Sequence, residues 1–299
     1  PSASPYYLLV GHNNNPLSWT DDNVPDTLSF QRLRRTWRFD RRGLDDGEKE
    51  VHIEISENDL PALPTGFTKY GIIVDNSNGA LPNLRSDNLQ IIGLTEYVPG
   101  IYECDVDIEI GSYLAVAAIK PFVNFNISSK SVIEGDDEDP VIQENFLLRL
   151  NYTPSLLDSS TATIDITGGT ANEGSDYTWS SATNLVKFIG GDNEEIGQVT
   201  IVNDNVADAN AVEQFYVAIT AVTGGLNIGQ RDSITYKILD NDPPPKLTFS
   251  AADYLFNESD GTVKVPMEII GDLSGFVSAT ADIIFSPTGN TALHNIDYI

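Results

Sequence analysis

The chain has 299 residues, enough for two or three domains, and its 44 acidic against 17 basic residues give a formal net charge of −27. This charge excludes nucleic acid as a main partner and disfavours anionic membranes, while it attracts divalent cations. A single cysteine excludes an intrachain disulfide, and no apolar run approaches the roughly 20 residues of a membrane span.

Short runs of alternating apolar and polar residues, bounded by Gly, Pro, Asn or Asp, predict a β-rich module over residues 1–120. Cys104 shares its alternating face with Tyr102 and Val106, so we expect a buried small hydrophobe rather than a reactive thiol. The strands predicted in this module are 6–10, 34–39, 51–55, 70–74, 89–94, 102–108 and 113–119.

Two polar segments of this module have alternative interpretations. Six arginines between residues 32 and 42 indicate either an exposed strand face paired with carboxylates, which we favour, or a docking face for an acidic partner. Residues 75–79 are rich in oxygen ligands, but an ordinary Asn-Gly turn is favoured over a calcium loop because no later glutamate follows.

The same strand pattern continues after Lys120-Pro121, where we place a domain boundary. Helical periodicity is absent, so the predicted fold class is all-β, with tandem antiparallel immunoglobulin-like β-sandwiches. Three prolines at 243–245 favour a short, stiff polyproline spacer and therefore an elongated array. The strands predicted between these boundaries include 146–150, 161–166, 198–202, 215–219 and 234–238.

An internal repeat supports this division. Phe125 and Glu134 recur as Phe249 and Glu258, 124 residues later, and the segment 171–177 recurs as 292–298. A spacing kept over such a distance indicates two copies of one domain. We therefore expect a module at 1–120, a sandwich at 121–242, a linker at 243–245 and the first part of a second sandwich at 246–299. Because the chain begins at Pro1 and the second copy stops early, we expect an excerpt of a longer protein.

Carboxylates gather at the strand ends of the first sandwich. If these ends meet at one edge, the charges repel one another and require a counter-cation. Calcium suits such a set because it takes six to eight oxygen ligands, whereas zinc would need Cys or His. The candidate ligands of the first sandwich are Glu134, Asp176, Asp204, Asp208, Glu213, Asp240 and Asp242.

Catalytic patterns are weak by comparison. The three histidines lack a Ser or Cys neighbour that would suggest a triad, and no phosphate loop or dinucleotide fingerprint is present. His52 alternates with apolar residues in a predicted strand and is expected to face solvent. Paired carboxylates can hydrolyse glycosides, but a structural repeat rarely duplicates an active site. We therefore predict that this segment is not an enzyme.

The repeat resembles the Calx-beta domain, an immunoglobulin-like calcium-binding module. The resemblance is carried by Phe125 to Glu134, by residues 171–177, by 186–191, by 201–204 with 213–217, and by 238–242. It implies a seven-stranded sandwich with calcium at one end, with Glu134, Asp176, Asp204, Asp240 and Asp242 as ligands and Glu213 beside them. In the second copy Glu258, Asp260 and Asp297 match these positions.

The chain departs from the family pattern in one loop. Where the family has an Asp-Asp pair and then a Glu, this sequence has Asp204-Asn205 and then Asp208, with an insertion at 209–212. The loss of formal charge should weaken calcium binding.

Residues 1–120 look like a domain that precedes such repeats in giant secreted proteins of Bacteroidota. The resemblance implies a secreted cell-surface protein whose repeats form a rod for adhesion or for surface filaments, with type IX export and gliding by analogy. The alternative is a spacer stalk that presents a catalytic or carbohydrate-binding domain located elsewhere. A third hypothesis is glycan binding by the first module, with Trp19 or Trp37 as a stacking platform. The sequence names no protein or glycan ligand, and beyond the neighbouring domains of the chain no partner is predicted.

Overall fold

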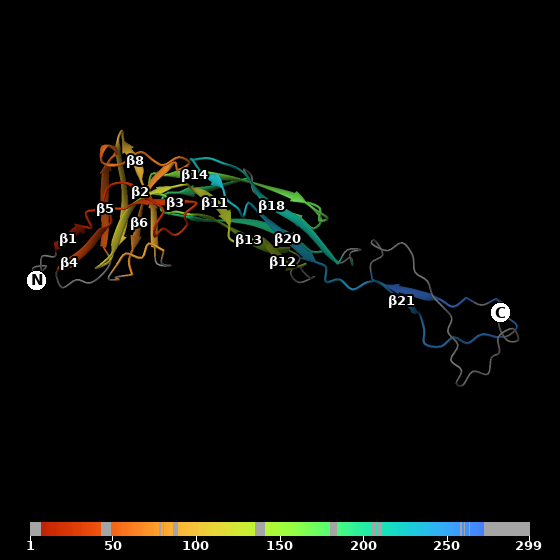
Figure 1. The fold of residues 1–299 in the computed structure, drawn as a ribbon. Coiled ribbons are helices and arrows are strands. Elements are labelled where there is room, and N and C mark those ends of the chain that lie inside the picture. The colour runs from red at the N-terminus through yellow and green to blue at the C-terminus, as the bar shows by residue number, and fades with distance from the viewer. Residues whose placement is uncertain are drawn as a thin grey trace, which may run out of the picture.

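The computed structural model confirms the all-β class, with the β-sandwiches arranged in an elongated array (Figure 1). It describes residues 7–42, 49–77, 79, 81–85, 89–134, 141–179, 184–204, 207, 211–257, 259, 261–262 and 264–271. The described helical structure includes a 3-10 turn, η1 (Glu57–Asp59), which Ser56 caps by accepting a hydrogen bond from Asn58 N. None of the described helical structure is long and apolar enough to cross a membrane.

The first module consists of two sheets packed around one apolar core. The larger sheet has the order β1-β4-β10-β3-β2, and β6 pairs with both β10 and β7. Its strands are β1 (Tyr7–His12), β2 (Trp19–Thr20), β3 (Phe30–Leu33), β4 (Trp37–Arg42), β6 (Lys69–Asp75), β7 (Leu89–Gly93) and β10 (Tyr113–Ile119). The smaller sheet, in the order β5-β9-β8, contains β5 (Lys49–Ser56), β9 (Ile101–Ile108) and β8 (Thr95–Val98). All seven residues of β10 are buried, so this strand is covered on both faces.

Cys104 lies inside the core of this module and is 3% exposed, as its alternating pattern predicts. Burial raises the pKa of the Cys104 thiol to about 12, with smaller contributions from Asp105 and Glu103. The thiolate is the reactive form, so we expect a thiol-specific reagent at pH 8 to label the native chain at least roughly 100-fold more slowly than the denatured chain. Equal labelling rates in the two states would contradict this placement.

The first sandwich consists of two five-stranded sheets rather than the seven strands that the resemblance implies. One sheet, β15-β17-β13-β11-β19, faces the other, β12-β20-β18-β14-β16. The count rises because the opening strand is divided, with β11 in one sheet and β12 in the other, and because two short strands of two residues, β15 and β19, are added. The first sheet contains β11 (Phe122–Phe125), β13 (Val141–Leu150), β15 (Tyr177–Thr178), β17 (Glu194–Val202) and β19 (Asn227–Ile228). The second contains β12 (Ser129–Ile133), β14 (Ser159–Gly168), β16 (Leu185–Ile189), β18 (Val212–Val222) and β20 (Ser233–Leu239).

The predicted boundary at Lys120-Pro121 is crossed by extensive contacts. The core that contains Ile73 and Ile119 of the first module continues without interruption to Phe125 and Phe146 of the sandwich. Backbone hydrogen bonds join Thr153 N to Ile91 O at 2.7 Å and Gly93 N to Thr153 O at 2.9 Å. The first module and the sandwich therefore share one packed body, which Figure 1 shows as adjoining sheets.

Half-buried polar groups reinforce this junction. Lys69 Nζ lies 2.8 Å from Asp158 Oδ2, and each side chain is 19% exposed. Thr95 donates a hydrogen bond from Oγ1 to Asp158 Oδ1 at 3.0 Å. Gly93 permits the close approach, because a Cβ there would lie 2.8 Å from the ring of Tyr152.

The part of the second repeat that the structure describes is one strand pair, β21 (Lys246–Phe249) with β22 (Met267–Ile270). Phe249 is 58% exposed, whereas its counterpart Phe125 is fully buried. Residues 243–245 precede β21 without strand pairing, as expected for a spacer.

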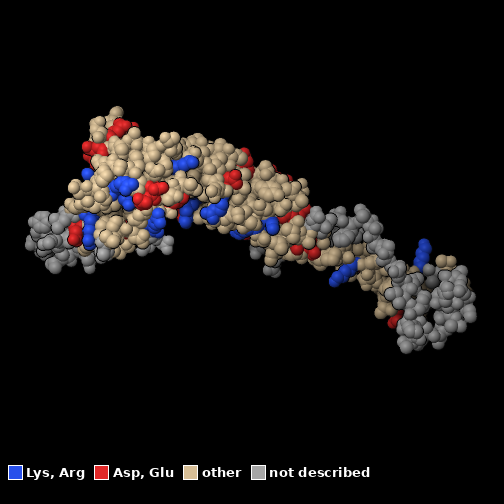
Figure 2. Space-filling model, viewed as in Figure 1, with Lys and Arg blue, Asp and Glu red and all other residues tan. Residues whose placement is uncertain are grey.

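Two interpretations for the first module can be compared with described contacts. Among the arginines, Arg32 Nε donates to Asp22 O, Arg35 Nε donates to Asn15 O, and Arg38 lies over the ring of Tyr113. The pairing of these arginines with carboxylates stays a prediction. Figure 2 shows Lys and Arg distributed along the visible face among acidic side chains, without a separate basic patch. Trp19 is half-buried, stacks on Tyr70 and donates its Nε1–H to Ala62 O, which does not suit an open stacking platform.

Candidate metal centre

The inner faces of several strands end in carboxylates at one end of the first sandwich. On β12 the buried Val132 is followed two residues later by Glu134, and on β20 the buried Ile238 is followed two residues later by Asp240. Because side chains alternate along a strand, these carboxylates occupy positions where the core would continue. Glu134 is only 6% exposed.

Parallel pairing brings the two strand ends together. Ile133 is the register partner of Leu239, and Glu134 N donates to Leu239 O at 2.9 Å. The chain then turns so that Asp242 N donates to Asp240 Oδ1 at 2.8 Å, which points Asp242 back towards the same place. The Oδ2 atom of Asp242 is buried.

These three residues form a cluster that can hold a metal ion. Glu134, Asp240 and Asp242 each offer one carboxylate oxygen, and all three oxygens lie within 4.8 Å of one another. Two oxygens bound to a calcium ion at about 2.4 Å can be no more than about 4.8 Å apart, so the three fit one ion. A set made only of oxygens suits calcium, and the rest of its shell can come from carbonyl groups and water.

Asp204 and Glu213 lie beside this cluster. Asp204 follows β17, and its backbone N–H donates to Glu134 Oε1 at 3.4 Å, although its own side chain is exposed. Glu213 is the register partner of the buried Ile238 and therefore shares the inner face of the sheet. Both positions border the three-carboxylate cluster.

Asp176 is held in its own turn rather than in the cluster. Its Oδ2 accepts a hydrogen bond from Asn172 N at 2.5 Å, and Gly174 supplies the positive φ of 97° that the turn needs. Its backbone carbonyl accepts from Val202 N at 3.0 Å, so the turn adjoins the residues that follow β17. This hydrogen bond uses one carboxylate oxygen of Asp176, Oδ2, so the role of Asp176 as a calcium ligand stays a prediction.

The remaining predicted ligands, Asp208, Glu258 and Asp297, lie outside the described residues, as does Asp260. Sequence reasoning missed Asn203, which follows the buried Val199 and Ile201 at the same two-residue period and is half-buried at this end of the sandwich. The signal for Asn203 in the sequence is the alternation of inward-facing residues along β17. Its side chain is neutral, so a pattern of carboxylates alone does not include it.

Three stacked aromatic rings lie in the core of the sandwich, on strands that carry or adjoin residues of the site. Phe215 stacks on Tyr177 with ring centroids 4.2 Å apart and on Tyr236 at 5.0 Å. Burial raises the pKa of Tyr177, with added contributions from Glu173 and Asp176, and burial likewise raises the pKa of Tyr236. The hydroxyl groups therefore stay neutral, and the negative charge of the site comes from the carboxylates.

Comparisons with known proteins agree with this architecture. The family model described as the Calx-beta domain matches residues 120–242 and again 240–298. No curated protein matches the chain significantly.

Several solved structures are similar to part of the chain. The apo form of the Calx CBD1 domain is 19% identical, with 41% of this chain and 98% of that chain covered and a TM-score of 0.35. The calcium binding domain CBD12 of CALX1.1 is 19% identical, with 48% and 56% covered and a TM-score of 0.35. The Calx CBD2 domain is 11% identical, with 40% and 86% covered and a TM-score of 0.34. Because the family model spans more than half of its residues, the chain belongs to the Calx-beta domain family.

Proposed function

We propose that this chain is a calcium-stiffened rod segment of an extracellular, cell-surface protein that serves adhesion or surface-filament structure. The observation that carries the proposal is the cluster of Glu134, Asp240 and Asp242 at the exit of the first sandwich. Asp242 is followed directly by the prolines at 243–245. An ion held there fixes the point at which the chain leaves one domain for the next.

The junction with the first module supports the same function. The continuous core and the Lys69–Asp158 ion pair hold the first module and the sandwich in one orientation. A rod needs stiffness at each joint, and the chain has packing at one joint and a carboxylate cluster at the other.

Calcium should stabilise the chain measurably. With an ion concentration of ~1 mM and a dissociation constant of ~0.1 mM, typical of extracellular modules, binding adds about 1.4 kcal/mol of stability. We expect the midpoint of thermal unfolding of the 299-residue chain to rise by about 3–6 °C on addition of millimolar calcium. The whole chain is used because the sandwich shares its core with the first module.

Magnesium at the same concentration is the control. It requires near-ideal octahedral geometry at shorter distances, so its effect should be smaller than that of calcium. A midpoint that stays unchanged in millimolar calcium would contradict the metal assignment. The adhesive role itself is tested by deleting these domains from the longer protein: retained binding of cells to their target at unchanged affinity would contradict it.

A further inference from the structure

A second group of ligand atoms lies on the outer face of the small sheet in the first module. His52 and Glu54 are two residues apart on β5, and their register partners on β9 are Asp105 and Glu103. The alternate residues Ile53 and Cys104 point into the core, so these four polar side chains share the opposite face. The side chain of His52 is 50% exposed.

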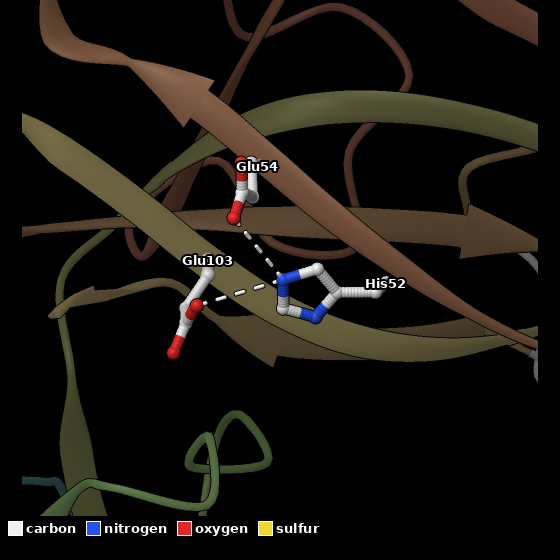
Figure 3. A group of neighbouring side chains, drawn as sticks. All are labelled: His52, Glu54 and Glu103. Atoms are coloured by element: carbon white, nitrogen blue, oxygen red, sulfur yellow. Dashed lines mark ion pairs between the residues drawn. The ribbon is translucent and has the colours of Figure 1, made fainter.

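A hydrogen bond fixes the orientation of the His52 ring. His52 Nδ1 lies 2.9 Å from Asp105 Oδ1. Because a carboxylate only accepts hydrogen bonds, Nδ1 must carry a proton and donate it. This leaves the second ring nitrogen, Nε2, directed at the carboxylates of Glu54 and Glu103, as Figure 3 shows.

The distances around Nε2 match the edges of a metal coordination polyhedron. Nε2 lies 3.6 Å from Glu54 Oε1 and 3.5 Å from Glu103 Oε2, and the three ligand atoms all lie within 4.8 Å of one another. A tetrahedral zinc ion with bonds of about 2.1 Å keeps its ligands about 3.4 Å apart. Little movement of the side chains would therefore be needed to admit the ion.

We propose that His52, Glu54 and Glu103 form a three-ligand site for a zinc-class divalent cation, with water in the fourth position and Asp105 as the residue that orients the imidazole. A metal-bound histidine usually donates its other ring N–H to a carboxylate, which is the arrangement here. The imidazole nitrogen distinguishes this site from the all-oxygen cluster of the sandwich and favours zinc over calcium.

The surroundings of the site are consistent with a bound cation. Glu54 and Glu103 are direct register partners, and like charges directly opposite one another destabilise a strand pair. Tyr97 on β8 donates its hydroxyl to Glu54 Oε1 at 3.2 Å, which restricts that carboxylate further. The three ligands lie on two adjacent strands, so an ion there would tie β5 to β9.

The test uses zinc added to the isotope-labelled 299-residue chain and follows the ring nitrogens of its three histidines by nuclear magnetic resonance. Zinc at one equivalent should shift the Nε2 resonance of His52 while His12 keeps its resonances. The variant His52→Gln should lose this binding, and Glu54→Gln and Glu103→Gln should each weaken it at least tenfold. Asp105→Asn should weaken it about 10–100-fold, as for other residues that orient a metal-bound histidine.

Asp107→Asn is the matched control, because Asp107 lies on the same strand, is exposed and carries the same charge, but is not one of the ligands. Its zinc affinity should stay within about twofold of the parent chain. The proposal is overturned if Nε2 of His52 does not shift, or if His52→Gln binds zinc as tightly as the parent chain does. Equal weakening by Asp107→Asn and Glu103→Gln would also overturn it, since that result indicates attraction by net charge alone.

Discussion

Replacing Asp240 by Asn is expected to abolish most of the calcium-induced rise in melting temperature. The substitution removes one negative charge and keeps nearly the same side-chain shape. The remaining side-chain oxygen can still accept the hydrogen bond from Asp242 N. A divalent ion and a carboxylate about 4 Å apart attract each other by about 2 kcal/mol even in water, so calcium affinity should fall by roughly 30-fold or more. Calorimetry with and without calcium measures the effect.

The same substitution should stabilise the calcium-free chain. Three carboxylate oxygens within 4.8 Å repel one another when no cation is present. Removing one charge relieves a repulsion on the order of 1 kcal/mol. If Asp240→Asn lowers the melting temperature in calcium but raises it without calcium, Asp240 belongs to a metal site. A carboxylate with only a structural role would change the melting temperature in the same direction in both conditions.

Asp232→Asn is the matched control for this prediction. Asp232 immediately precedes β20 at its other end, is exposed and carries the same charge. This variant should keep the full calcium response. If Asp240→Asn retains the response too, the cluster is not the calcium site.

Tyr152→Ala should separate the unfolding of the first module from that of the sandwich. Tyr152 is 3% exposed, packs against the position of Gly93 and lies under Lys69, whose Nζ is 5.8 Å from the ring centroid. Deleting a buried aromatic side chain typically costs about 3–5 kcal/mol, because a cavity remains. We expect the first calorimetric midpoint to fall by about 6–20 °C and one transition to become two.

Tyr97→Ala is the matched control for the junction. Tyr97 is also a tyrosine, but it lies on β8 of the first module and is 42% exposed, so its removal should change stability by no more than about 0.5 kcal/mol. If Tyr152→Ala still unfolds in a single transition at the original midpoint, the cooperative unfolding of the first module and the sandwich does not depend on this contact.

Local patterns in the sequence predicted many of the strands and part of the site. The predicted strand 34–39 is wrong in its first half, because residues 34–36 connect β3 to β4. Alternation predicts the inward positions of β20, and the same alternation carries Asp240 to the end of the core. Glu134 and Asp242 lie close to Asp240 because β12, near the start of the sandwich, pairs with β20, its last strand. Their role as calcium ligands stays a prediction.

Other features depend on contacts that no local pattern encodes. Thr153 pairs with Ile91 across a predicted domain boundary, which only the docking of two sheets brings about. The neighbours of His52 depend on strand register: β5 and β9 are separated by more than 40 residues, and their alternation does not say which residue faces which. The sequence position of Asp176 also does not reveal that its Oδ2 closes a local turn, and its role as a ligand stays a prediction.

The parallel pairing of β12 with β20 has a mechanical consequence. The chain enters this pair at Ser129, on the side of the first module, and leaves it at Leu239, on the side of the spacer, after five register pairs. A force that pulls on the two ends of the chain therefore drags these strands in opposite directions along their length. All hydrogen bonds between them are loaded together in shear and cannot be opened one after another, so the sandwich should resist extension strongly along the line from the first module to the spacer.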